Sequence, residues 1–204
     1  MKKTFLIICI LSLFVGCTNK QIGYEDEIKN FQYELNTQFA DAEESPLTEE
    51  DLKSFKTLDF FSIDKKYNIT AKFTRTPNEP VFEMPTTTDR LPLYKKYGVA
   101  YFTLNGEKIE LNIYQNQQLM TSIEYENHLF LPFNDASNGK STYGGGRYID
   151  LEIPKKNTTI IRIDFNKAYN PYCAYNHKYS CPIPPKENTI PTEILAGVKA
   201  YSKH

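Results

Sequence analysis

Several features that would assign a function at once are missing from this sequence. It contains no tryptophan, its formal net charge is only −1, and it shows no internal repeat and no long linker. Beyond Cys17, no apolar run approaches the roughly 20 residues of a membrane-spanning helix. The balanced charge, with an acidic leading segment, argues against nucleic acid as a partner. Because 15 Tyr and 13 Phe make the chain too apolar for disorder, the sequence predicts a folded globular protein.

The N-terminus has the three parts of a secretory signal. Residues 2–3 are lysines, residues 4–15 are apolar apart from one serine, and small residues follow them. Residues 14–17, which read Phe-Val-Gly-Cys, resemble the lipobox of bacterial lipoproteins, although leucine is usual where this chain has Phe14. An ordinary cleaved signal is the alternative interpretation.

From this pattern we expect residues 1–16 to be a signal peptide, Cys17 to carry lipid such as palmitate, and residues 17–23 to form a tether. Several acyl chains, each contributing roughly 0.8 kcal/mol per buried methylene, would make the attachment permanent. The protein would then be anchored to a membrane of the cell envelope, facing the periplasm or the exterior.

Residues 24–56 are predicted to be helical. Between residues 25 and 40, apolar side chains recur at spacings of three and four, as in an amphipathic helix: Ile28, Phe31, Leu35 and Phe39. Thr48 precedes three acids and is expected to cap a short second helix that ends near Lys56. Acidic side chains greatly outnumber lysines in this segment, which is typical of a solvated helix face.

Residues 57–170 are predicted to form the β core, because the apolar period changes from 3.6 to 2. Asn105-Gly106 predicts a hairpin between strands 99–104 and 108–114, with Phe102 facing Ile109 and Ala100 facing Leu111. Further strands are expected at 67–73, 128–133, 147–153 and 158–165. The expected fold is mainly β (α+β): an antiparallel barrel or sandwich behind one or two N-terminal helices, with an irregular, proline-rich tail over 171–204.

A glycine-rich loop precedes one of these strands. Gly139-Lys140-Ser141 has the end of a nucleotide-binding P-loop, but the glycine that should stand five residues earlier is Asn134 and no helix pattern follows. Residues 144–146 are all glycine, and two interpretations stay open. They form either a tight turn with Arg147 in a salt bridge, or a nest of backbone amides that binds an anion beside Arg147.

Two cysteines in the tail stand close together in sequence. Cys173 and Cys181 flank His177, and two thiols this close in an oxidising compartment predict a disulfide. A metal site that includes His177 lacks a fourth ligand, and free thiols are the remaining alternative. We therefore predict no metal and no cofactor.

Four ordered motifs in the last third of the chain resemble the bacterial family DUF1684, a domain of unknown function. They are Phe130–Asp135, Thr142–Tyr148, Asp164–Asn176 and Tyr179–Asn188, and Ile194–Gly197 follows them. Val198 departs from the usual glutamate, so it is given no role. The resemblance implies a single domain over residues 24–204 with the family's β fold and a shared polar pocket. It implies no established activity.

Polar and aromatic residues of these motifs are the candidate ligand-binding groups: Asp135, Tyr143, Arg147, Asn166, Tyr169, Asn170, Tyr175, Glu187 and Asn188. The preferred function is a non-catalytic envelope module that binds a small polar or anionic ligand or a cell-wall component, since Tyr and Asn suit sugars. One alternative is a structural or assembly lipoprotein whose acidic helix meets a protein partner not identified by the sequence. The other is a hydrolase that uses Asp135, Glu187 and His177, although no nucleophile elbow or zinc signature accompanies them.

Overall fold

The computed structural model describes residues 22–201, so the predicted signal peptide, the predicted lipidation site Cys17 and most of the predicted tether lie outside the described residues. Two helices come first, α1 (Tyr24–Ala40) and α2 (Glu49–Ser54). Eight strands follow: β1 (Asn68–Arg75), β2 (Val81–Glu83), β3 (Leu93–Leu104), β4 (Glu107–Asn116), β5 (His128–Asp135), β6 (Arg147–Glu152), β7 (Ile160–Asp164) and β8 (Thr189–Ile190). No helix of residues 22–201 is both long enough and apolar enough to cross a membrane.

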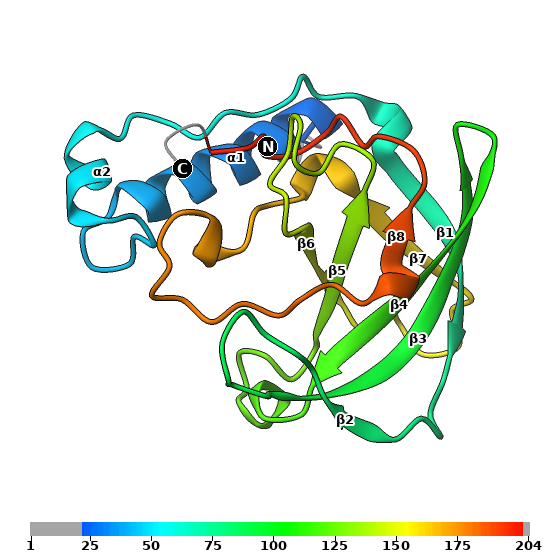
Figure 1. Cartoon of the computed structure of the whole chain (residues 1–204). Coiled ribbons are helices and arrows are strands. Elements are labelled where there is room, and N and C mark those ends of the chain that lie inside the picture. The colour runs from blue at the N-terminus through cyan, green and yellow to red at the C-terminus, as the bar shows by residue number, and fades with distance from the viewer. Residues whose placement is uncertain (1–21, 202–204) are drawn as a thin grey trace, which may run out of the picture.

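The strands form one curled sheet with the order β6-β5-β4-β3-β1-β7 (Figure 1). All pairings along this path are antiparallel, while β2 extends the β3 edge and β8 lies parallel to β5. The sheet is a half-barrel, with α1 and α2 beside one end of it (Figure 1). The expected mainly antiparallel β fold behind N-terminal helices is confirmed, and a half-barrel is its shape.

The predicted hairpin joins β3 to β4 in the expected register, with Phe102 opposite Ile109 and Ala100 opposite Leu111. Asn105 and Gly106 have φ values of 52° and 85°, the left-handed conformations that this two-residue turn requires. The predicted cap is also present, because the Thr48 hydroxyl accepts the backbone N–H of Asp51 at 3.2 Å.

Alternate residues of β5 and β6 point to opposite faces of the sheet, as the pleat of a strand requires. Leu131 pairs with Ile149, and both face the apolar core enclosed by the half-barrel. Phe130 pairs with Asp150 on the outer face. There Phe130 belongs to a second, aromatic cluster with Tyr94, Tyr114, Tyr148 and Met84. The two strands therefore separate an apolar interior from an aromatic exterior.

The tail after β7 is mostly irregular, as its prolines predict. It contains short 3-10 turns at Phe165–Lys167, Tyr172–Ala174 and Lys186–Asn188, and it returns to the sheet at β8. The strands β2 and β8 were not predicted, because stretches of two or three residues carry no measurable period. Through this path the tail covers the outer face of β5 and β6 (Figure 1).

Candidate functional site

Arg147, the residue predicted to stand beside an anion, instead holds parts of the interior together. Its side chain is fully buried and forms an ion pair with the equally buried Asp135, with 2.8 Å between Nη2 and Oδ2. The guanidinium also donates to the backbone carbonyls of Ile194, Ala196 and Val198 in the tail. Burial lowers the pKa of Arg147, and the Asp135 carboxylate opposes that shift. Arg147 therefore fastens the tail to β6 and has no room for an external anion.

Asp135 is saturated by internal donors as well. Its Oδ1 accepts the backbone N–H of Ser137 at 2.8 Å and that of Ile194 at 3.1 Å. The Ser137 hydroxyl bonds to the same oxygen. A carboxylate with these partners and no exposure cannot reach a substrate, so the role of acid or base in a hydrolase does not fit Asp135.

The glycine loop of residues 144–146 forms a tight turn, the first of its two interpretations. Gly146 has a φ of 87°, and a Cβ there would lie 2.8 Å from the Phe133 carbonyl oxygen and 2.7 Å from Pro184. Glycine is needed because the backbone turns sharply beneath packed neighbours. Arg147 then points inward to Asp135 and not toward the loop, so it is in a salt bridge as the first of the two open interpretations has it, and the alternative of an anion nest beside Arg147 is wrong.

Two of the predicted asparagines brace the backbone. Asn188 is fully buried, and its amide exchanges hydrogen bonds with the N–H and C=O of Asn112 at 2.8 Å each. Asn166 accepts the N–H of Asp64 at 3.0 Å and donates to the Tyr24 hydroxyl at 2.9 Å. These bonds join the tail to β4 and to the helical lead, and neither side chain lines a large cavity.

The remaining predicted residues are dispersed. Asn170 is buried and donates to the Tyr175 hydroxyl at 3.2 Å, and Tyr175 packs edge-on against Phe39 of α1 with 4.8 Å between the ring centroids. Glu187 is exposed in the turn next to buried Asn188. The prediction of one shared polar recess is therefore wrong: the side chains are polar because they satisfy buried backbone groups.

The predicted disulfide is not formed in the structure. Cys173 and Cys181 are both free thiols and both buried. They are nevertheless neighbours, since the Cys173 backbone N–H donates to Cys181 Sγ at 3.1 Å, and the Tyr143 hydroxyl lies 3.9 Å from Cys173 Sγ. A hydrogen bond from Cys181 lowers the pKa of the Cys173 thiol to about 7. No group of three metal-ligating side chains occurs within residues 22–201.

A separate cavity lies on the outer face of β5 and β6. It has a volume of about 660 Å³, and its walls come from α1, the starts of β3 and β5, the end of β4, the loop between β4 and β5, β6 and the tail. The rings that line it are Phe31, Tyr94, Tyr125, Phe130, Tyr148, Tyr169, Tyr172 and Tyr179. We call this cavity the aromatic pocket. Of the predicted binding residues, Tyr169 lines the aromatic pocket and the others do not.

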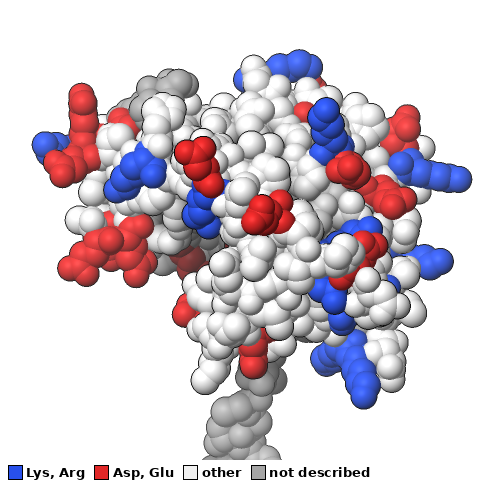
Figure 2. Space-filling view, turned by 60° about the horizontal axis from the view of Figure 1, so that its bottom comes forward, with Lys and Arg blue, Asp and Glu red and all other residues white. Residues whose placement is uncertain are grey.

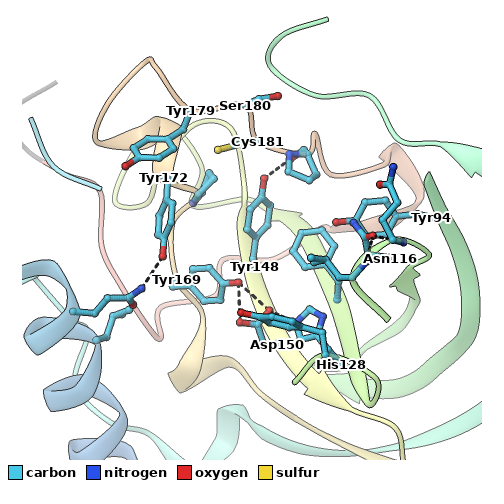
Figure 3. A pocket seen from close by; sticks show the side chains of 18 of the residues that line it. Tyr94, Asn116, His128, Tyr148, Asp150, Tyr169, Tyr172, Tyr179, Ser180 and Cys181 are labelled. Atoms are coloured by element: carbon cyan, nitrogen blue, oxygen red, sulfur yellow. Dashed lines mark hydrogen bonds and ion pairs between the residues drawn. The ribbon is translucent and has the colours of Figure 1, made fainter. Parts of the chain in front are cut away.

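The rings of the aromatic pocket stand at steep angles to one another (Figure 3). Tyr148 and Tyr169 are 5.9 Å apart between centroids with an interplanar angle of 87°, and Tyr172 and Tyr179 are 5.3 Å apart at 64°. In the view of Figure 3, Tyr148 and Tyr172 lie on either side of Tyr169. The walls therefore present ring faces in several directions.

Polar groups are concentrated around Asp150. Both of its carboxylate oxygens accept the Tyr169 hydroxyl at 2.9 Å, and His128 Nε2 lies 2.9 Å from Oδ1. The Asp150 side chain is 51% exposed, so it keeps access to the pocket. Burial raises the pKa of Tyr148 and that of Tyr169 well above the ordinary value, and the Asp150 carboxylate adds to the shift of Tyr169. Both phenols are therefore neutral at physiological pH.

The face shown in Figure 2 carries no single dominant charge. Asp and Glu side chains predominate at the left of this view, whereas Lys and Arg side chains lie mostly at the right, interspersed with Asp and Glu. Charged side chains of both signs also lie in the middle of the face.

Sequence reasoning missed most residues of the aromatic pocket, among them His128 and Asp150. A signal was present in β6, where Arg147 and Ile149 alternate with Tyr148 and Asp150. An arginine within a strand indicates a functional residue, but Arg147 and Ile149 point inward. Tyr148 and Asp150 point outward and line the pocket.

The comparisons with known proteins agree with this fold. A family model described as a protein of unknown function, DUF1684, matches residues 53–199. The chain belongs to the DUF1684 family. A similar solved structure is the solution NMR structure of an uncharacterized protein from Haloarcula marismortui, with 30% sequence identity and a TM-score of 0.69 over 89% of this chain and 96% of that one. The comparison with curated proteins gave no match.

The DUF1684 match begins within α2, so it contains most but not all of the aromatic pocket. The strands and the tail that line the pocket fall inside residues 53–199. The wall from α1, which includes Glu34 and Gln38, precedes the matched residues.

Proposed function

We propose that this DUF1684 protein is a non-catalytic, lipid-anchored module of the cell envelope that binds a small organic ligand in the aromatic pocket. The observation that supports the proposal is a cavity of about 660 Å³ with aromatic walls and a few fixed polar groups. Ligand sites of proteins commonly have 300–1,000 Å³ and this mixture of side chains. The signal-like N-terminus and Cys17 support the envelope location.

The proposed ligand is polar rather than anionic. Arg147 was the main reason to expect an anion, and it is neutralised by Asp135 in the interior. Two basic side chains line the aromatic pocket, Arg90 and His128, and both have partners: Arg90 donates to Ser180, and His128 contacts Asp150. Asp150 and Glu34 supply acidic groups in the same walls.

A binding role is favoured over hydrolysis because of how the polar groups are held. The hydrolase alternative needs Asp135 and Glu187, of which the first is sealed in an ion pair and the second is exposed outside the pocket. Groups that touch the pocket are tied to one another, as Tyr169 is to Asp150. Fixed side chains of this kind orient a ligand at a low entropic cost.

The test is a thermal-shift screen of the purified mature protein against small envelope metabolites, repeated with two variants. We expect at least one saturable increase in Tm, lost in Tyr172→Leu, which opens the pocket wall, and kept in Tyr33→Ala. Tyr33 is the matched control because it lies on α1 but is 72% exposed and outside the pocket. No saturable shift, or an equal loss in both variants, would contradict the proposal.

The lipid anchor is tested separately. Cells that express the full chain should incorporate labelled palmitate, and Cys17→Ser should abolish the label and release the protein from the membrane fraction. Incorporation that survives Cys17→Ser would refute the anchor without affecting the pocket.

A further inference from the structure

We infer that the ligand of the aromatic pocket carries an alkylated ammonium group, which the tyrosine faces and Asp150 recognise together. The inference rests on the proposed function, because it names the chemistry of that same site. Four observations on the pocket support it: the ring orientations, the use of the tyrosine hydroxyls, the charges of the walls, and the volume.

The ring orientations suit a cation. The face of an aromatic ring carries negative potential, and an ammonium within about 6 Å of the centroid is attracted to it. Tyr169, Tyr172 and Tyr179 line the pocket and are only half-buried, so part of each ring is open to it. Tyr172 and Tyr179 are inclined at 64° with 5.3 Å between their centroids, and Tyr169 is nearly perpendicular to the buried Tyr148. The accessible rings therefore present surfaces to a compact group from several directions.

The hydroxyls of the pocket tyrosines are largely committed inside the protein. The Tyr148 hydroxyl donates to the Pro182 carbonyl, and the Tyr169 hydroxyl donates to Asp150, so neither has a proton left for a ligand. The Tyr172 hydroxyl accepts the Gln38 amide at 2.9 Å. Apart from the proton of the Tyr172 hydroxyl, what these residues still offer is their ring surface. Quaternary ammonium needs no hydrogen bond, whereas a saccharide needs many.

The charges of the walls favour a positive ligand. No lysine lines the aromatic pocket, and the Arg90 guanidinium is turned to Ser180, with its Nη2 2.7 Å from the carbonyl oxygen. Of the Asp150 carboxylate, His128 Nε2 contacts only Oδ1, and the carboxylate stays half exposed although it also accepts the Tyr169 hydroxyl. Glu34 is an exposed acid in the wall that α1 supplies. A carboxylate beside aromatic faces adds a direct ionic attraction to the cation–π contact.

The volume shows that the ligand has more than an ammonium head. A cavity of about 660 Å³ is much larger than a trimethylammonium group. Leu119, which is 43% exposed, lines the pocket and offers an apolar surface for the rest of the molecule. A free alkylammonium metabolite and a lipid headgroup share this chemistry, and the experiment below distinguishes these two sources.

The decisive experiment is calorimetric titration of the mature protein with choline and with dimethylbutanol, its neutral carbon isostere. We expect choline to bind about 10-fold more tightly, since one to two favourable cation–π contacts have this effect. Asp150→Asn should weaken choline several-fold and leave the isostere unchanged. Tyr172→Phe, which keeps the ring, should retain binding, while Tyr172→Leu should lose it; Tm values of all variants report whether they fold.

Two further titrations separate the outcomes. If the protein binds vesicles of phosphatidylcholine but not vesicles of phosphatidylglycerol, the ligand is a lipid headgroup. If it binds free choline but neither kind of vesicle, the ligand is a soluble metabolite. Either result supports the inference. Equal binding of choline and its isostere overturns the inference and keeps the proposed pocket. If the protein binds N-acetylglucosamine but not choline, the inference is again overturned and the proposed pocket is kept. If no probe binds, the inference falls, and the metabolite screen then decides the proposed function independently.

Discussion

The Asp135–Arg147 ion pair and the aromatic pocket lie on the two faces of the same strands, β5 and β6. Phe133 pairs with Arg147 on the inner face, and Phe130 pairs with Asp150 on the outer face. On the inner face, the polar side chains are fully buried and bond to one another and to backbone groups. On the outer face, a carboxylate stays half exposed beside aromatic rings. Polar motifs in a sequence can therefore serve either packing or binding, and the face of the strand decides which.

The largest expected effect is on the inner face. Arg147→Met should lower the free energy of unfolding by about 3–5 kcal/mol, because it leaves the Asp135 carboxylate buried without its partner. Urea denaturation measures this loss. The control is Lys140→Met, which removes an ion pair to Glu193 between side chains that are 68% and 45% exposed and should lose less than about 1 kcal/mol. Equal losses of unfolding free energy in the two variants would show that the buried ion pair contributes no more to stability than an exposed one.

The glycine loop gives the next effect. Gly146→Ala should cost more than the roughly 1–2 kcal/mol of a left-handed residue, because the new Cβ also meets Phe133 and Pro184. Gly106→Ala is the matched comparison, since its φ is 85° but nothing lies within 4 Å of the new Cβ. Thermal denaturation of both variants should rank Gly146→Ala as clearly less stable. The reverse order would contradict the close packing beneath the loop.

Asn188→Ala should cost about 1–3 kcal/mol, because the change leaves backbone groups of Asn112 and Pro132 without partners in the interior. Asp150→Asn on the outer face should change stability by less than about 1 kcal/mol, since its carboxylate is half exposed. Urea denaturation compares the two variants directly. A large loss of stability in Asp150→Asn would make that residue a brace like Asn188 and weaken its role in binding.

The smallest effect concerns Cys173, whose thiol beside Cys181 has a pKa of about 7 against an ordinary value near 9. Because folding lowers the pKa of Cys173, the thiolate predominates above about pH 7 and becomes protonated as the pH falls below this value. The ultraviolet absorbance of the Cys173 thiolate, taken as the difference between the wild type and Cys173→Ser, should therefore rise between about pH 6 and pH 8, and Cys181→Ala should move the rise upward. This titration needs no reagent to reach the buried thiol, and the intact mass shows whether the two thiols are free. A mass lower by two hydrogens would show a disulfide and contradict the free thiols.

The sequence predicted the fold better than the site, and the reason is physical. Periodicity reports which side of a strand is apolar, so the strands, the Asn105-Gly106 turn and the Thr48 cap could all be read from local patterns. Two-residue β8 has no period, and its pairing with β5 depends on the path of the whole tail.

The site could not be read in the same way because local polarity does not report tertiary partners. Arg147 looks like a ligand-binding residue until Asp135 and the tail carbonyls are placed around it. The pocket walls come from α1, four strands and the tail, so their rings meet only after folding. Tyr148 and Asp150, an outward-facing ring and carboxylate on β6, were the nearest local signal.

The most direct test of the account is two-dimensional amide NMR of the protein during titration with choline. We predict shifts confined to the walls of the aromatic pocket, including Asp150, Tyr169 and Tyr172, with no change around Asp135 and Arg147. Shifts centred on Asp135 and Arg147 would contradict the claim that the outer face binds and the inner face only holds the fold together.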